Sequence, residues 1–310
     1  MTVRRAHLKK KSIFYLLFSI EILLNSILFS QTKIFQPSEK LNKKRIFIAS
    51  GLISYVEIGS FGGLYHVWYS ENMNPKFQFF NDLGNWGNVD KYGHAYSTYQ
   101  LSRTYANLFK WTGITKKKSA IIGSAIGLGY QTTLEIFDGY SNNYGFSWGD
   151  MGFNFLGSFV FMSQELWLKE QIFLPKFSYH PTEYAKLRPT ILGSNHIERL
   201  LKDYNGQTYW LSFSPGSMTK RTRFPNWLCF SFGYGIDARI VGDKTSYLGT
   251  DGTIYRSKKE FYLSLDIDLK KLPIKNKGIK KVLTTLNYLK IPAPTISIQG
   301  NQFRFYPIYF

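Results

Sequence analysis

Residues 119–138 read SAIIGSAIGLGYQTTLEIFD. This stretch is apolar and rich in glycine, and it predicts a helix that ends at Asp138-Gly139, because glycine stops helices well. The helix closes on two acids, Glu135 and Asp138, which share one face at a spacing of three residues. Glu135 has apolar neighbours and stands where the helix dipole disfavours negative charge. We therefore expect a packed helical domain in which Glu135 has a partner.

Three further stretches predict helices around this one. Residues 90–110 follow a helical pattern, but polar residues near the middle make a poor lipid-facing span. Ser147 is a natural N-cap for a helix that continues to about residue 170. Residues 46–69 are long and apolar enough to cross a bilayer, although their glycines also suit close packing in a bundle. We favour a packed four-helix bundle-like domain over a polytopic channel.

The pattern changes beyond Leu187. Apolar residues alternate there with polar or small ones, which is typical of strands, in residues 209–213, 227–240, 260–268, 295–298 and 303–310. These segments are too few for a full outer-membrane barrel. Residues 276–290 predict one basic amphipathic helix. The predicted fold class is α+β, with an N-terminal four-helix bundle-like domain followed by a β-rich C-terminal region.

The N-terminus is typical of an exported protein. Basic residues precede an apolar run from Ile13 to Phe29, and Ser30 offers a cleavage point; an uncleaved membrane anchor is the alternative. No cysteine follows the run, so we expect no lipid anchor. We expect the protein in the periplasm or associated with the outer membrane. The predicted organisation is a signal peptide at 1–30, a linker at 31–45, a helical domain at 46–175 and a β-rich basic domain at 188–310.

Charge is concentrated in the second half of the chain. The formal net charge is +19, and residues 176–310 hold 21 Lys and Arg against 9 Asp and Glu. A basic exported surface most simply meets anionic headgroups, so membrane lipid or another envelope component is the expected partner. Nucleic acid is the rival partner, but export and the lack of a nucleic-acid motif argue against it. The single cysteine, Cys229, permits no disulfide within the chain and is typical of a small buried hydrophobe.

Three helix ends hold most of the acids of the helical domain. Short turns make consecutive helices antiparallel, so the start of 90–110, the end of 119–137 and the start at Ser147 lie at one end of the domain. Their polar residues are Asp90, Lys91, His94, Glu135, Asp138, Ser147 and Asp150. We predict that these seven residues form the functional site.

The chemistry of this cluster leaves alternatives open. It could hold a divalent metal, with His94, Glu135 and Asp138 as ligands, or an acid–base pair in which crowded charges raise one pKa. Three of its acids could instead be a helix cap, a turn former and a first-turn acid. Those roles leave Glu135 unexplained, and Lys91 or His94 is its candidate partner. A nucleophilic triad is disfavoured, because the residues around Ser147 do not form a G-x-S-x-G elbow.

These motifs resemble a known family. Residues 65–170 contain Asp90-Lys91-x-x-His94, then Glu135-x-x-Asp138, then Gly145-Phe146-Ser147-Trp148-x-Asp150, and this combination resembles the YfiM-like family, also called domain of unknown function 2279. The C-terminal extension resembles the long form seen in Bacteroidota. A fainter likeness is to the VanZ-like membrane proteins. The resemblance implies an envelope location and the polar cluster, and it implies no particular reaction.

Two functions follow as hypotheses. The first is a structural or accessory membrane-associated protein of the envelope, held together by a buried network of acids and histidine. The second is an envelope hydrolase that acts on a lipid or glycan, with His94 as general base or metal ligand and Lys91 as anion binder. The first is favoured, because a buried polar network needs no substrate. The sequence does not decide whether the protein is an enzyme.

Overall fold

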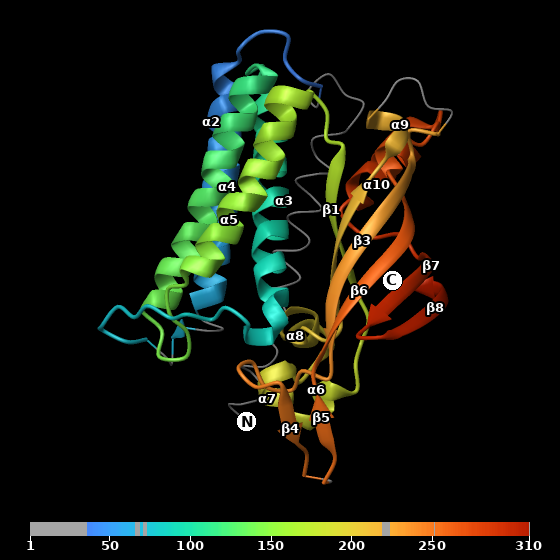
Figure 1. Ribbon diagram of the computed structural model, residues 1–310. Coiled ribbons are helices and arrows are strands. Elements are labelled where there is room, and N and C mark those ends of the chain that lie inside the picture. The colour runs from blue at the N-terminus through green and yellow to red at the C-terminus, as the bar shows by residue number, and fades with distance from the viewer. Residues whose placement is uncertain (1–35, 66–68, 71–72, 219–223, 251, 310) are drawn as a thin grey trace. The chain divides into compact units, whose positions relative to one another are not determined.

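A computed structural model describes residues 36–65, 69–70, 73–218, 224–250 and 252–309 (Figure 1). The predicted signal peptide at 1–30 lies outside the described residues. The chain divides into two compact units. The helical unit takes its described residues from 36–81 and 97–170, and the sheet unit takes them from 82–96 and 171–309. Helices precede a six-stranded antiparallel sheet, which confirms the predicted α+β class.

Long helices build the helical unit. They are α2 (Lys43–Leu64), the later part of α3 (Val89–Trp111), α4 (Lys116–Gly139) and α5 (Trp148–Ser163), which continues into the π-helical turn η4 (Gln164–Leu168). The predicted N-cap is confirmed, since the side chain of Ser147 accepts the backbone N–H of Asp150. Asn42 caps α2 in the same way. The start of α5 was therefore predictable, because its capping residue marks it.

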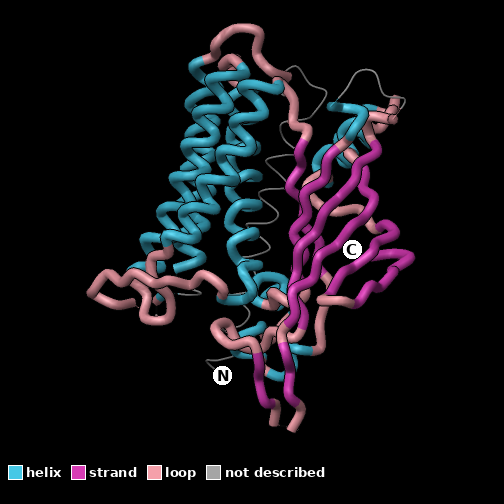
Figure 2. The backbone as a smooth tube through the Cα atoms, viewed as in Figure 1, coloured by secondary structure: helices cyan, strands magenta, loops and turns pink. Residues whose placement is uncertain are grey.

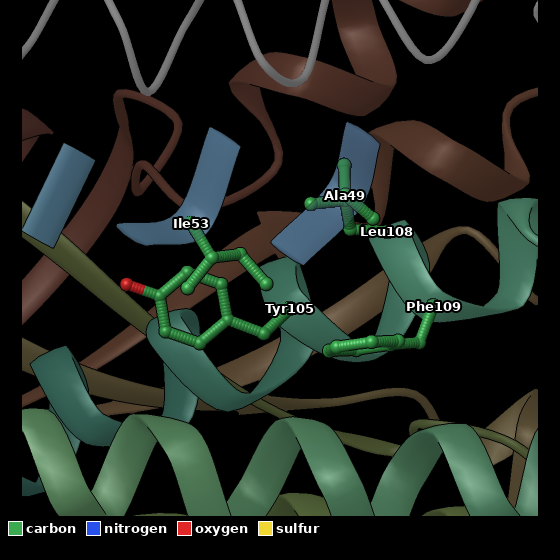
Figure 3. Packing of buried hydrophobic residues seen from close by; sticks show 5 residues of the cluster. All are labelled: Ala49, Ile53, Tyr105, Leu108 and Phe109. Carbon is green, nitrogen blue, oxygen red and sulfur yellow. The ribbon is translucent and has the colours of Figure 1, made fainter. Parts of the chain in front are cut away.

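Small residues and one apolar cluster hold these helices together. A Cβ added at Gly123 of α4 would lie 2.3 Å from the backbone nitrogen of Ala106 on α3, so the two backbones are in direct contact. Glycine lets them approach this closely because it has no Cβ. The apolar cluster of Figure 3 joins α2 to α3 through Ala49, Ile53, Tyr105, Leu108 and Phe109.

The sheet unit is built on six antiparallel strands in the order β1-β2-β3-β6-β7-β8 (Figure 2). They are β1 (Phe173–Tyr179), β2 (Gln207–Phe213), β3 (Leu228–Asp237), β6 (Lys258–Ile267), β7 (Ala293–Gln299) and β8 (Gln302–Tyr309). A separate hairpin pairs β4 (Ser246–Leu248) with β5 (Ile254–Arg256). The predicted basic helix is α10 (Lys277–Leu286). Shorter helical turns are η3 (Asn85–Asn88), α6 (Tyr184–Leu187), α7 (Pro189–Leu192), α8 (His196–Lys202), α9 (Pro215–Met218) and η5 (Leu269–Lys271).

The sheet buries its polar face. Along β6 the buried residues are Glu260, Tyr262, Ser264 and Asp266, and the exposed ones between them are Phe261, Leu263 and Leu265. Strand β7 repeats the pattern, with Thr295 and Ser297 buried and Ile296 exposed. Most sheets with one solvated face show the opposite arrangement. The strand alternation was predictable, and the burial of its polar half was not.

Candidate functional site

Glu135 is at the centre of the contacts between the end of α4 and the start of α5. Its side chain is buried, with 1% exposed, and its Oε2 accepts the backbone N–H of Ser147 at 3.3 Å. The hydroxyl of Ser147 in turn accepts the backbone N–H of Asp150 at 3.1 Å. The first N–H groups of a helix lack intrahelical acceptors and carry partial positive charge. The charge of Glu135 is unfavourable at the C-terminal end of α4, but it is favourable where its carboxylate lies, at the N-terminus of α5.

Asp138 belongs to a different group of contacts. The hydroxyl of Tyr69 donates a hydrogen bond to its Oδ1 at 2.7 Å. Burial, and then the charge of Asp138, raise the pKa of the Tyr69 phenol above its usual range. Burial and the same carboxylate also raise the pKa of Tyr144. Asp138 thus accepts a hydrogen bond from Tyr69 and acts on Tyr144 through its charge.

Polar residues continue along the buried face of α5. Asp150 and Asn154 are buried one turn apart, and Ser158 follows another turn later. The hydroxyl of Thr98 on α3 donates to Oδ1 of Asn154 at 3.0 Å, and the hydroxyl of Ser158 donates to the carbonyl oxygen of Ser124 on α4 at 3.1 Å. Side-chain hydrogen bonds therefore connect α5 to α3 and to α4.

The remaining predicted site residues lie in the sheet unit, at the start of α3. Lys91 is fully buried, and its Nζ lies 2.5 Å from Oδ2 of Asp82 and 3.1 Å from Oδ2 of Asp90. Two carboxylates thus surround one ammonium group. His94 stands one turn after Asp90 on the same helix and is partly buried.

Sequence reasoning missed two sets of polar residues. Asp82 stands in a loop, where no periodicity marks a residue as buried. The other set is a network inside the sheet unit, where Nζ of buried Lys176 lies 2.8 Å from Oδ2 of Asp266 and Nζ of Lys290 lies 4.0 Å from Oδ1. Ser212 donates to the same Asp266 carboxylate at 2.6 Å. Burial lowers the pKa of Lys290 to about 8, although Asp266 opposes the shift.

Comparison with known proteins places the candidate residues within one family match. A family model described as predicted periplasmic lipoprotein (DUF2279) matches residues 78–163. This match supports the family resemblance over a minority of the chain, and the seven predicted site residues all lie inside it. Neither a curated protein nor a solved structure matches the chain. The family description confirms the predicted location, an exported protein of the periplasm or envelope.

Proposed function

We propose that the protein is a structural or accessory membrane-associated protein of the cell envelope, whose helical unit is held together by a buried polar network. The observation that carries this proposal is the chain of hydrogen bonds from Glu135 through Ser147 to Asp150. Its partner would be membrane lipid or another envelope component, which a basic chain with net charge +19 favours.

The hydrogen bonds of this network support a structural role. The carboxylates of Glu135 and Asp138 accept from Ser147 and Tyr69, so each is engaged in joining helix ends to loops. A hydrogen bond to a charged group contributes about 1.5–3 kcal/mol, and leaving a buried partner unsatisfied costs as much or more. Removal of such an acid is therefore expected to unfold the helical unit at lower temperature.

A second candidate function is an envelope hydrolase that uses a divalent cation on a lipid or glycan. The observation that favours it is a pair of buried acids inside the helical unit, Glu135 and Asp150, each of which offers a carboxylate oxygen within 4.8 Å of the other. Imidazole and carboxylate are common ligands of zinc and manganese. This pair includes Asp150 in place of Asp138, whose carboxylate accepts from Tyr69. In this role His94 would serve as ligand or general base, and Lys91 would bind the anionic part of the substrate.

The metal content of the purified full chain distinguishes the two functions. It would be measured by mass spectrometry for the wild type, for His94→Ala, and for a control, His196→Ala, at an exposed histidine of α8. No bound metal, together with a lower unfolding temperature in His94→Ala alone, is the result expected of the structural protein. Near-stoichiometric zinc, manganese or magnesium that only His94→Ala loses would overturn it in favour of the hydrolase.

A further inference from the structure

The helices of the helical unit bury small and polar residues. On α4 the buried residues are Ser119, Ala120, Gly123, Ser124, Gly127, Gln131, Glu135 and Gly139. On α5 they are Asp150, Asn154, Gly157, Ser158 and Phe161. A helix on the surface of a water-soluble domain instead turns a stripe of large apolar residues towards the core.

The large apolar residues point outward. On α5, Phe155, Leu156 and Phe159 are exposed, with 58% of Phe155 accessible. Helix α4 exposes Ile121 and Ile136. Helix α2 exposes Phe47, Ile48, Tyr55 and Ile58, and Phe47 is 81% accessible. Three helices thus combine polar or small contacts inside with an apolar exterior, as helices in a bilayer do.

The lengths of these helices match a bilayer. Helix α2 has 22 residues, α4 has 24, and α5 with η4 has 21 (16 and 5). At 1.5 Å per residue these lengths are about 31–36 Å, and the hydrocarbon core of a bilayer is about 30 Å thick. By length and apolar composition alone, α2 is the one helix among the described residues that could cross a membrane. Helix α5 by itself has only 16 residues, and α4 carries more polar residues than α2, most of them buried or partly buried.

Aromatic and basic residues mark the two boundaries of this apolar zone. Trp148 and Trp167 begin and end the α5 segment, are 71% and 70% exposed, and stand 19 residues apart, which is about 29 Å of helix. Exposed tryptophans gather at the interfaces of a membrane. Beyond the Trp167 end lie exposed lysines at the start of α2, the end of α3, the start of α4 and after η4: Lys43, Lys44, Lys110, Lys117, Lys118 and Lys169. Lysines at this level fit anionic headgroups.

Several polar groups between these boundaries form hydrogen bonds inside the unit. The hydroxyls of Thr132 and Thr133 donate to carbonyl oxygens four residues earlier in α4, at 2.8 and 2.9 Å. The hydroxyl of Tyr130 donates to that of Ser60 on α2 at 2.8 Å. A bilayer core offers no water to such groups, so internal hydrogen bonds are what it requires.

We infer that the helical unit is embedded in a lipid bilayer, with the exposed faces of α2, α4 and α5 against the acyl chains. Lipid is the occupant that these observations favour over a second copy of the chain, because the apolar surface is spread over three helices and is bounded by tryptophans and lysines at bilayer spacing. The inference goes beyond the proposed function and does not depend on whether the polar network binds a metal.

Site-directed spin labelling tests this inference on the full chain. Nitroxides would be attached at Phe155→Cys and Phe159→Cys, in the middle of α5, after reconstitution into vesicles of phosphatidylethanolamine and phosphatidylglycerol. Matched controls are Asn142→Cys and Lys117→Cys, at exposed positions near the two ends of the unit. Cys229 is buried, and the wild-type chain measures its labelling background.

We expect the nitroxides at 155 and 159 to collide with oxygen more often than with a water-soluble nickel complex. At 142 and 117 we expect the reverse order. Nickel access at 155 and 159 equal to that at 142 would mean a water-exposed face and overturn the inference. Low access of both reagents at 155 and 159 would mean that protein, such as a second copy, covers the face, and would overturn it as well. Release of the wild-type chain from cell membranes by alkaline carbonate would contradict embedding independently.

Discussion

The carboxylate of Glu135 accepts the backbone N–H of Ser147 at 3.3 Å, so an acid near the end of α4 lies at the N-terminus of α5. This contact explains why an acid stands at position 135, which the preferences of its own helix do not explain. A carboxylate is unfavourable near the C-terminus of its own helix and favourable at the N-terminus of another. The contact therefore fixes the turn between α4 and α5, from which Ser147 and Asp150 follow.

Substitution of Glu135 tests that role. Glu135→Ala removes the acceptor of the Ser147 N–H in a buried place, and we expect it to lower the free energy of unfolding by about 2–4 kcal/mol. Glu135→Gln retains an acceptor oxygen and loses only the charge, so we expect about half that effect. Thermal unfolding of the purified protein, followed by circular dichroism, measures both. Equal unfolding temperatures for Glu135→Ala and the wild type would show that the contact stabilises nothing.

The contact between α3 and α4 gives a prediction with an internal control. Gly123→Ala would place a Cβ 2.3 Å from the backbone nitrogen of Ala106, so a helix must shift, at a cost of about 1–3 kcal/mol. At Gly129 of the same helix an added Cβ meets nothing within 4 Å. Gly129→Ala should therefore be neutral or stabilise by up to about 1 kcal/mol, because alanine favours the helix. Gly123→Ala should lower the unfolding temperature and Gly129→Ala should not, and a similar loss in both variants would contradict the packing described.

Much of the fold was predictable because local chemistry marks it. The capping side chain of Ser147 marks the start of α5, and the alternation of apolar and polar residues in 260–268 predicts β6. Strand β1 was missed, because Pro175 is typical of a break between elements. The strand lies at the edge of the sheet, where a missing N–H costs little.

Burial was less predictable than secondary structure. Alternation tells which residues of β6 share a face, but it does not tell which face is inside, and here Asp266 is buried while Leu265 is exposed. The same ambiguity concealed the network that Lys176 and Lys290 form with Asp266 in the sheet unit. The contact of Glu135 with Ser147 was predictable in part, because the end of one helix and the start of the next share one level in an antiparallel pair. Asp82, which pairs with Lys91 from a loop, has no such pattern.

The buried ion pair of the sheet unit should be sensitive to the loss of one partner. Lys176→Met leaves Asp266 buried with less compensation, and we expect a loss of about 3–5 kcal/mol. Lys186 forms an exposed pair with Glu183, and Lys186→Met should change stability by less than about 1 kcal/mol. Urea unfolding monitored by tryptophan fluorescence compares the two variants, because Trp210 lies beside Lys290 in this network. Losses of similar free energy of unfolding in both variants would show that the buried pair contributes no more to stability than the exposed one.

The lowered pKa of Lys290 predicts how stability changes in alkaline solution. Its pKa is about 8 in the folded protein, against 10.5 for an ordinary lysine. Between these values the unfolded chain binds the extra proton, so this group makes the protein more stable as the pH rises from about 8 to 10.5, and its full penalty is present below pH 8. The gain is at most about 3 kcal/mol, since one pKa unit corresponds to about 1.4 kcal/mol. Lys290→Met removes the titration, whereas the tyrosines and other lysines titrate in both proteins. The free energy of unfolding of the wild type minus that of Lys290→Met should therefore increase across this pH range, and a constant or falling difference would contradict the burial of a protonated Lys290.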